Sequence, residues 1–278
     1  MASELVLRLV RTLQQFEWPV EKDLTAASLA LYEQGLELVD SYHGDERILR
    51  EALRIFSSCG ARPYALAGIA YVMNAAAFRP AAYYTLAVEA ATFSQFDQYD
   101  QDDIQEALGN LSQAQEMAPD RTEIDFIEVR FYTDMRRLQD ARLVLDYLQR
   151  RAPDNYHLCL MEIVYWRGLT DLEQARAWYE RAIQTAANNR RRVNALMLLA
   201  LSYFRCSRLP EAIRLLRQVT TVLPNDPWIW CELGAAHARL QQFTEAEMCV
   251  RKALSSGEMP AARELEAVIQ RTRLRRPL

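Results

Sequence analysis

Glycine and proline are scarce in this sequence, with 8 and 10 of them among 278 residues. Their scarcity excludes collagen-like and low-complexity chains, and a content of 50% hydrophobic and 25% charged residues is typical of a nearly all-helical soluble protein. No apolar run is long enough to span a bilayer, and Arg8 and Arg11 interrupt the apolar residues that a secretion signal would need. We therefore expect a cytoplasmic protein without membrane insertion.

Catalytic motifs are also missing. The three histidines, His43, His157 and His237, are scattered, and there is no H-E-x-x-H, no phosphate loop, no Rossmann fingerprint and no nucleophile signature. The five cysteines are odd in number and form no C-x-x-C pair, which favours reduced, buried thiols. The sequence therefore predicts a protein that is not an enzyme and holds no cofactor.

Two charged clusters could be mistaken for ligand sites. The acids between Asp97 and Asp103 lack the glycine of a calcium loop and lead directly into an apolar-periodic segment, so they are better explained as the start of a helix. The triplet Arg190 to Arg192 has no interleaved aromatic residues and is expected in a solvated turn. Neither metal nor nucleic acid is therefore predicted as a ligand.

The clearest positive signal lies between Pro227 and Ala253. Trp230, Leu233 and Gly234 have the spacing W-x2-L-G, and small and bulky residues follow at Ala246, Val250 and Ala253. This pattern resembles the tetratricopeptide repeat, in which two helices form one unit. Counting back 34 residues gives another set of matching residues, namely Leu196, Leu199, Ala200, Tyr203, Ala212, Leu216 and Pro224.

Two further units precede these. One begins near Thr122 and the next near Tyr156, again 34 residues on, whereas the third begins near Val193 rather than at residue 190. Three residues are therefore inserted within Ala186–Arg192, and we expect them as a longer second helix or a wider turn.

The resemblance implies an all-α fold, a right-handed α-α superhelix of tetratricopeptide-type helix hairpins with a C-terminal capping helix. One hairpin cannot bury its apolar face alone, so the repeats must stack. We expect a divergent helical region at 1–60, divergent repeats at 61–121, four repeats at 122–260 and a capping helix with its tail at 261–278, all in one solenoid. Within the divergent part, helices are predicted at 24–39 and 45–58, a first helix around Gly68, and a further first helix at 81–96 preceding a second helix at 107–119.

Function would lie on the first helices, which in this family line the inside of the superhelix. The predicted peptide-binding residues face this groove on successive first helices and are Phe126, Arg130, Arg167, Asn194, Met197, Leu201, Arg205, Trp228 and Arg239. Such a groove is apolar with a line of guanidinium groups, which suits a protein or peptide with apolar and acidic residues. For apolar positions such as Leu160, Val164 and Leu201, packing between adjacent first helices is an equally good explanation.

These features favour a non-enzymatic interaction scaffold, an adaptor or assembly chaperone that binds a peptide segment of its partner. One alternative is a peptide-sensing regulator that acts on DNA, although residues 1–60 are acidic and contain no convincing recognition helix. A second is self-association, with a homo-oligomer formed through the apolar stripe in residues 1–18.

Charge is distributed unevenly along the chain: residues 1–155 hold 25 acids and 15 bases, and residues 156–278 hold 12 acids and 18 bases. This asymmetry suits either a charged partner or a simple drift of solvated helix faces.

Overall fold

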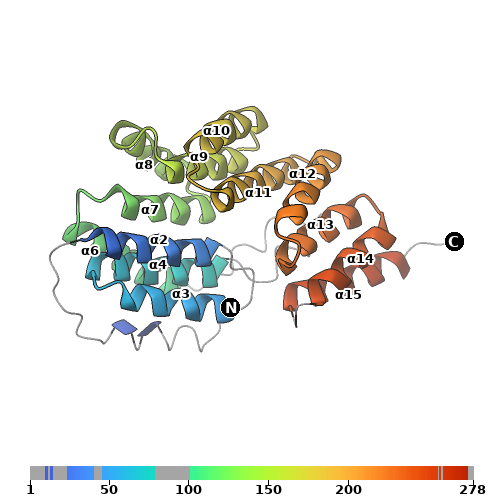
Figure 1. Ribbon diagram of the computed structural model, residues 1–278, viewed down its shortest axis with the longest axis horizontal. Coiled ribbons are helices and arrows are strands. Elements are labelled where there is room, and N and C mark those ends of the chain that lie inside the picture. The colour runs from blue at the N-terminus through green and yellow to red at the C-terminus, as the bar shows by residue number, and fades with distance from the viewer. Residues whose placement is uncertain are drawn as a thin grey trace. The chain divides into compact units, whose positions relative to one another are not determined.

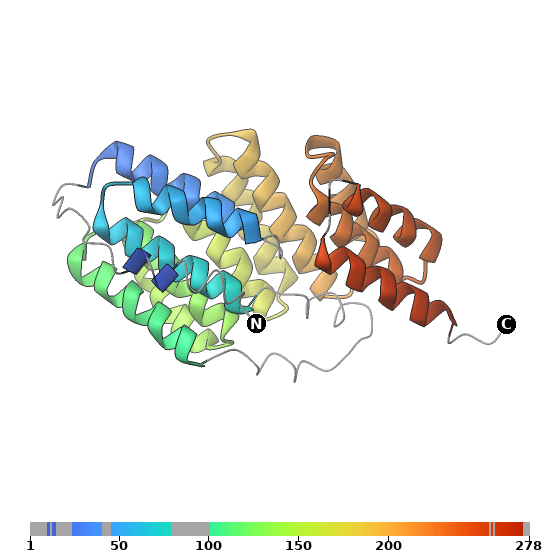
Figure 2. The same cartoon turned by 90° about the horizontal axis from the view of Figure 1, so that it is seen from below.

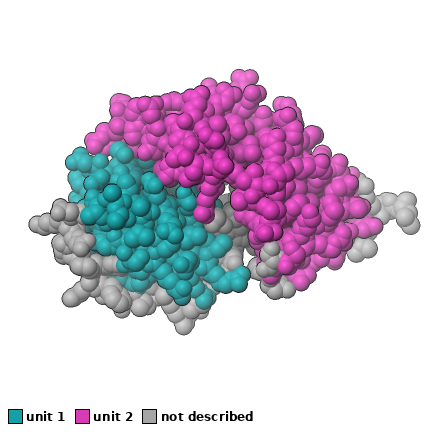
Figure 3. All heavy atoms as spheres, in the orientation of Figure 1, with its two compact units in different colours: residues 1–80, 94–131 teal, residues 81–93, 132–278 magenta. Residues whose placement is uncertain are grey.

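The computed structural model describes residues 10–11, 13–14, 24–40, 46–78, 101–255, 257 and 259–274. Thirteen helices and no strands are present in these residues, which confirms the predicted all-α class (Figure 1). None of these helices is both long and apolar enough to cross a membrane. The chain divides into two compact units, residues 1–80 with 94–131 and residues 81–93 with 132–278 (Figure 3). The helix predicted at 81–96 and most of the apolar stripe in residues 1–18 lie outside the described residues.

The first unit is built from α2 (Ala26–Asp40), α3 (Glu46–Ser58), α4 (Arg62–Phe78), α6 (Gln101–Met117) and the start of α7 (Thr122–Asp134). The helices predicted at 24–39 and 45–58 are confirmed to within two residues. The helix α6 packs mainly against α4, so these two form a pair although 22 residues separate them in the sequence. The hydroxyl of Tyr64 donates to Glu123 Oε1 at 2.5 Å, and the Tyr32 hydroxyl donates to the Glu123 carbonyl at 3.3 Å, which ties α7 to α4 and α2.

Two glycines leave the space that an aromatic ring occupies in the core of this unit. The Phe56 ring of α3 is fully buried and lies against Gly35 of α2 and Gly68 of α4, where any Cβ atom would overlap with the ring. Only glycine leaves room for the ring at both contacts. The sequence indicated that Gly68 is a signature glycine, but not that an aromatic ring from the preceding helix occupies the space beside it.

We expect Gly68→Ala to lower the free energy of unfolding by about 1–3 kcal/mol, because the added methyl group forces the Phe56 ring from its place. Urea unfolding followed by circular dichroism measures this change. Gly109→Ala in α6 is the matched control, since nothing lies within 4 Å of its Cβ position and alanine favours helix by up to about 1 kcal/mol. Equal destabilisation by both substitutions would contradict the packing described.

The second unit continues with α8 (Leu138–Arg151) and then repeats one hairpin. Three pairs follow, α9 (Tyr156–Gly168) with α10 (Leu172–Thr185), α11 (Asn189–Arg205) with α12 (Leu209–Val222), and α13 (Pro227–Arg239) with α14 (Phe243–Leu254). The last helix, α15 (Pro260–Leu274), packs against α13 and α14 (Figures 1 and 2). Gly234 of α13 permits this packing, because its Cβ position is 3.2 Å from Cys249 Cβ and 3.4 Å from Leu265 Cδ2.

The turn that follows each first helix has the same backbone geometry four times. A non-glycine residue adopts a left-handed conformation, with φ of 58° at Arg136, 59° at Thr170, 58° at Ser207 and 61° at Gln241. The next backbone N–H then donates to the carbonyl five residues earlier, as in a Schellman motif, and the four bonds measure 2.8 to 3.0 Å. The spacing of these turns, 34, 37 and 34 residues, confirms the period and the three-residue insertion.

The expected form of that insertion was wrong. The helix α10 ends at Thr185, and α11 begins at Asn189 and has 17 residues, against 13 in α9 and in α13. The Asn188 side chain accepts a hydrogen bond from the Arg191 N–H at 2.9 Å and so starts the helix early. The inserted residues therefore lengthen a first helix rather than a second helix or a turn, and Arg190 to Arg192 lie in its first turn rather than in a loop.

Candidate functional site

The residues predicted to bind a peptide fall into both units. Phe126 and Arg130 lie on the part of α7 that belongs to the first unit. The other seven lie in the second unit on three successive first helices, with Arg167 on α9, Asn194, Met197, Leu201 and Arg205 on α11, and Trp228 and Arg239 on α13.

Burial separates the apolar members of this set from the polar ones. Phe126, Met197 and Leu201 are 5%, 7% and 9% exposed, so packing between helices accounts for most of their surface. Arg130, Arg167, Asn194, Arg205, Trp228 and Arg239 are half-buried. The groups that keep access to solvent are therefore mainly guanidinium groups, an amide and one indole ring.

Arg239 links α13 to α11. Its guanidinium lies 5.1 Å from the centre of the Phe204 ring and donates to the Phe204 carbonyl at 3.5 Å and to Ser207 Oγ at 3.2 Å. Burial lowers the pKa of this guanidinium from its ordinary value. Arg239 therefore both closes the end of α11 and carries a charge that burial leaves poorly solvated.

A buried carboxyl on α13 was missed by the sequence reasoning. Glu232 is 2% exposed, and its Oε1 atom has no hydrogen-bond partner among the residues that the structure describes. Burial raises the pKa of this carboxyl to about 8, although the positive charge of Arg167 opposes the shift. The effect of Arg167 on this pKa also shows that a charge on α9 acts on a residue in the middle of α13.

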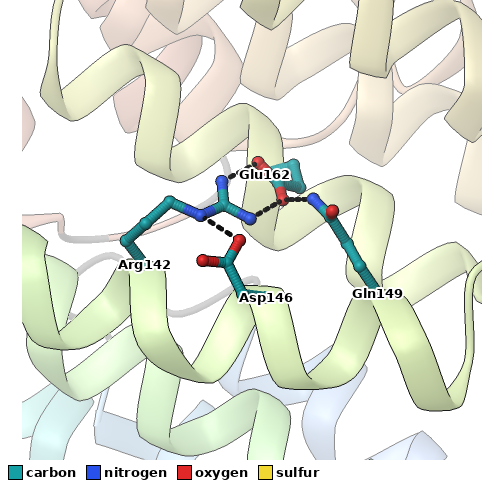
Figure 4. A network of polar contacts seen from close by, with 4 residues as sticks. All are labelled: Arg142, Asp146, Gln149 and Glu162. Atoms are coloured by element: carbon teal, nitrogen blue, oxygen red, sulfur yellow. Dashed lines mark hydrogen bonds and ion pairs between the residues drawn. The ribbon is translucent and has the colours of Figure 1, made fainter.

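A second buried acid, Glu162 on α9, has the opposite environment, since polar side chains meet around it (Figure 4). Its carboxylate is fully buried and receives Arg142 Nη1 at 3.1 Å and Arg142 Nη2 at 2.9 Å, and Gln149 also donates to it. Arg142 Nε donates in turn to Asp146 at 2.7 Å. The Arg142 guanidinium also lies 5.2 Å from the centre of the Tyr165 ring, so this network fastens α8 to α9.

The sequence did contain a signal for this network. Glu162 stands 37 residues before Leu199 and 71 residues before Leu233, which is the register of the signature leucine. A charged residue at an apolar position of the repeat predicts a buried partner. In the same hairpins, His237 Nδ1 lies 2.6 Å from Gln242 Oε1, so this histidine joins the end of α13 to its turn.

A family profile described as tetratricopeptide repeat matches residues 193–236, and a second of the same description matches residues 229–256. The matched ranges contain most of α11 and all of α12, α13 and α14. The chain contains tetratricopeptide repeats. The same turn geometry also follows α7 and α9, at Arg136 and Thr170.

Solved tetratricopeptide structures share the fold at low identity. A thermophilic TPR protein of Thermus thermophilus is 18% identical with a TM-score of 0.52, and the match covers 69% of this chain and 97% of that one. A tetratricopeptide repeat protein of Parabacteroides merdae is 14% identical with a TM-score of 0.54, covering 90% and 88%. The APC/C hetero-tetramer Cut9-Hcn1 gives 14% and 0.53, with 95% of this chain and 46% of that one. No curated protein sequence matches at a significant level.

Proposed function

We propose that this tetratricopeptide protein is a non-enzymatic scaffold for protein–protein interaction, an adaptor or assembly chaperone that acts in the cytoplasm. Its ligand is a peptide segment of a partner protein, held on the inner side of α9, α11 and α13. The observation that carries the proposal is the succession of half-buried arginines on these helices, Arg167, Arg205 and Arg239. Each stands in the last turns of its first helix, so the same charged group recurs at the same end of three successive repeats.

The chemistry of these residues defines the ligand. Guanidinium groups bind carboxylates in a planar, bidentate arrangement, and partial burial strengthens such bonds. Trp228 and Asn194 lie on the same helices, eleven residues before Arg239 and Arg205, and offer an aromatic ring and an amide nearer the start of each helix. A peptide with one or two acids and apolar anchors fits this set best, and a nucleic acid backbone without apolar groups fits it less well.

Two other functions are compatible with the same fold. A peptide-sensing regulator would use the same inner residues, so it differs in its output and not in its site. A self-associating assembly protein would use residues 1–18 instead, and sedimentation over a range of concentrations would detect it.

The test is charge reversal at two of the inner arginines. We expect Arg205→Glu with Arg239→Glu to abolish binding of the partner recovered by co-purification from the native host. The reason is that two attractive charges become repulsive, and isothermal titration with the purified partner measures the loss. Arg150→Glu with Arg192→Glu is the matched control, because both arginines are exposed, have no ion pair in the described structure and carry the same charge change.

Circular dichroism and thermal unfolding must accompany the titration, since Arg239 also contacts Phe204 and Ser207. Arg205→Glu alone separates the two roles, and it should weaken binding at least about tenfold with the fold intact. Normal binding by the folded double variant would place the site elsewhere than on the first helices.

A further inference from the structure

The outer helices of the last two hairpins carry a second set of cations. Arg214 and Arg217 on α12 and Arg251 and Lys252 on α14 are all exposed, and we refer to these four as the outer basic surface. Arg217 and Arg251 are 34 residues apart, so they occupy the same position of successive second helices. Arg214 lies one helical turn before Arg217, on the same side of α12.

The charges of this surface lie close together. Cys249 of α14 is buried, and burial raises the pKa of its thiol to about 11, while the positive charges of Lys252 and Arg217 oppose the shift. Cations from two different helices therefore act on one thiol, and the negative charge of Glu245 acts on it in the opposite sense. The Lys252 ammonium also lies 4.0 Å from the centre of the Trp230 ring, which fixes it beside the start of α13.

Three of these cations differ from several arginines around them, because they form no ion pair within the described residues. Arg208 pairs with Glu211, Arg263 with Glu266 at 3.1 Å, and Arg273 with Glu247 at 3.1 Å. In the part of the chain that the structure describes, Arg214, Arg217 and Arg251 make no ion pair. The acids Glu211 and Glu245 lie on the same two helices, but neither forms an ion pair with these cations, which can therefore bind a partner of opposite charge.

Apolar groups accompany the cations on the same helices. Met248 is 47% exposed and lies one turn before Lys252, and Val222 at the end of α12 is 54% exposed. A thioether and an isopropyl group have no donor or charge that could bind a phosphate, but they pack well against apolar side chains of a polypeptide. The Trp230 ring has Lys252 over its face and donates its indole N–H to the Pro224 carbonyl at 2.7 Å, so it is already engaged within the protein.

From these observations we propose that the outer basic surface docks an acidic segment of a protein partner. The charges are complementary, and residues 156–278 as a whole hold 18 bases against 12 acids. The site is separate from the inner groove, because it lies on second helices whereas Arg205 and Arg239 lie on first helices. A scaffold with two such surfaces holds two different segments at once, one on each side of the repeat stack.

The experiment uses the full chain and a fluorescein-labelled peptide of Glu, Asp and Leu, with binding followed by fluorescence anisotropy at low and physiological salt. The groove is expected to bind a similar peptide, so the comparison is made in a protein that already carries Arg205→Glu and Arg239→Glu. There we expect Arg217→Glu with Arg251→Glu to weaken binding at least about tenfold, and the loss to shrink as salt is added. The matched control, Arg150→Glu with Arg192→Glu, removes the same charge from α8 and α11 and should change affinity less than about twofold.

Three results would overturn the proposal. The first is equal weakening by the matched control, which would show that net charge alone governs binding. The second is complete loss of binding already in Arg205→Glu with Arg239→Glu, because the peptide would then occupy the groove. The third is binding of a labelled oligothymidine of equal charge as tight as that of the peptide, which would make the surface a nucleic acid site. Failure of the groove proposal leaves the expected effect of Arg217→Glu with Arg251→Glu unchanged.

Discussion

Arg142→Ala should lower the free energy of unfolding by about 3–5 kcal/mol, because it leaves the fully buried carboxylate of Glu162 without its main counter-charge. Gln149 alone cannot replace a bidentate guanidinium, and the contact with the Tyr165 ring is lost as well. Guanidinium chloride unfolding followed by circular dichroism measures the effect. Asp146→Ala should cost less than about 1 kcal/mol, since this carboxylate is exposed and makes a surface ion pair with the same arginine.

A double substitution tests whether the network replaces an apolar contact. Arg142→Met with Glu162→Leu restores the signature leucine and removes both charges together, so most of the stability should return. If the double variant is as unstable as Arg142→Ala, the network does more than substitute for the apolar contact found at Leu199 and Leu233.

Glu232→Gln should stabilise the protein at alkaline pH by up to about 5 kcal/mol, because the folded protein must otherwise ionise this buried carboxyl of α13. The pKa of Glu232 is raised from 4.5 to about 8, so below pH 4.5 both the folded and unfolded states hold the proton and the group costs nothing. As the pH rises from 4.5 towards 8, the unfolded state releases its proton first and wild-type stability falls. Above pH 8 the loss is complete.

Glutamine cannot ionise, so the difference between variant and wild type should grow across this window and then become constant. Thermal and urea unfolding at pH 5, 7 and 9 measure it. The control is Glu245→Gln on the exposed side of α14, which should change stability by less than about 0.5 kcal/mol throughout. Parallel pH profiles for wild type and Glu232→Gln would contradict the buried, unpaired state of this carboxyl.

The sequence predicted the hairpins from Thr122 onward because their pattern is local. Trp230, Leu233 and Gly234 lie within two turns of one helix, and their contacts recur every 34 residues. The pairing of α6 with α4 was not predictable in this way, since no local spacing relates helices separated by residues 79–100. The position of the insertion depended on one side chain, Asn188, which could have capped a helix or ended a turn.

The candidate site was predictable only as a set of positions. Helical spacing put Arg167, Arg205 and Arg239 on one side of their helices, but it could not decide which apolar neighbours pack away, as Met197 and Leu201 do. It could not find Glu232 either, because a polar residue between two apolar ones looks exposed in a sequence. The environment of such a residue depends on helices that lie far along the chain, and the peptide-binding role of the set stays a prediction.

The early start of α11 places three like charges in the first turn of this helix, where they repel one another and the positive end of the helix dipole. Three residues add about 4–5 Å to a helix, and here they bring Arg190 to Arg192 to the end where the helix dipole is positive. The Asn188 cap and the Tyr156 ring, 5.2 Å from the Arg191 guanidinium, hold this turn against that repulsion. Dissolved anions screen repulsion between such cations, so we expect the local stability of this turn to rise with ionic strength, whereas the proposed binding through the arginine surfaces should weaken. Salt would then have opposite effects on the scaffold and on its contacts.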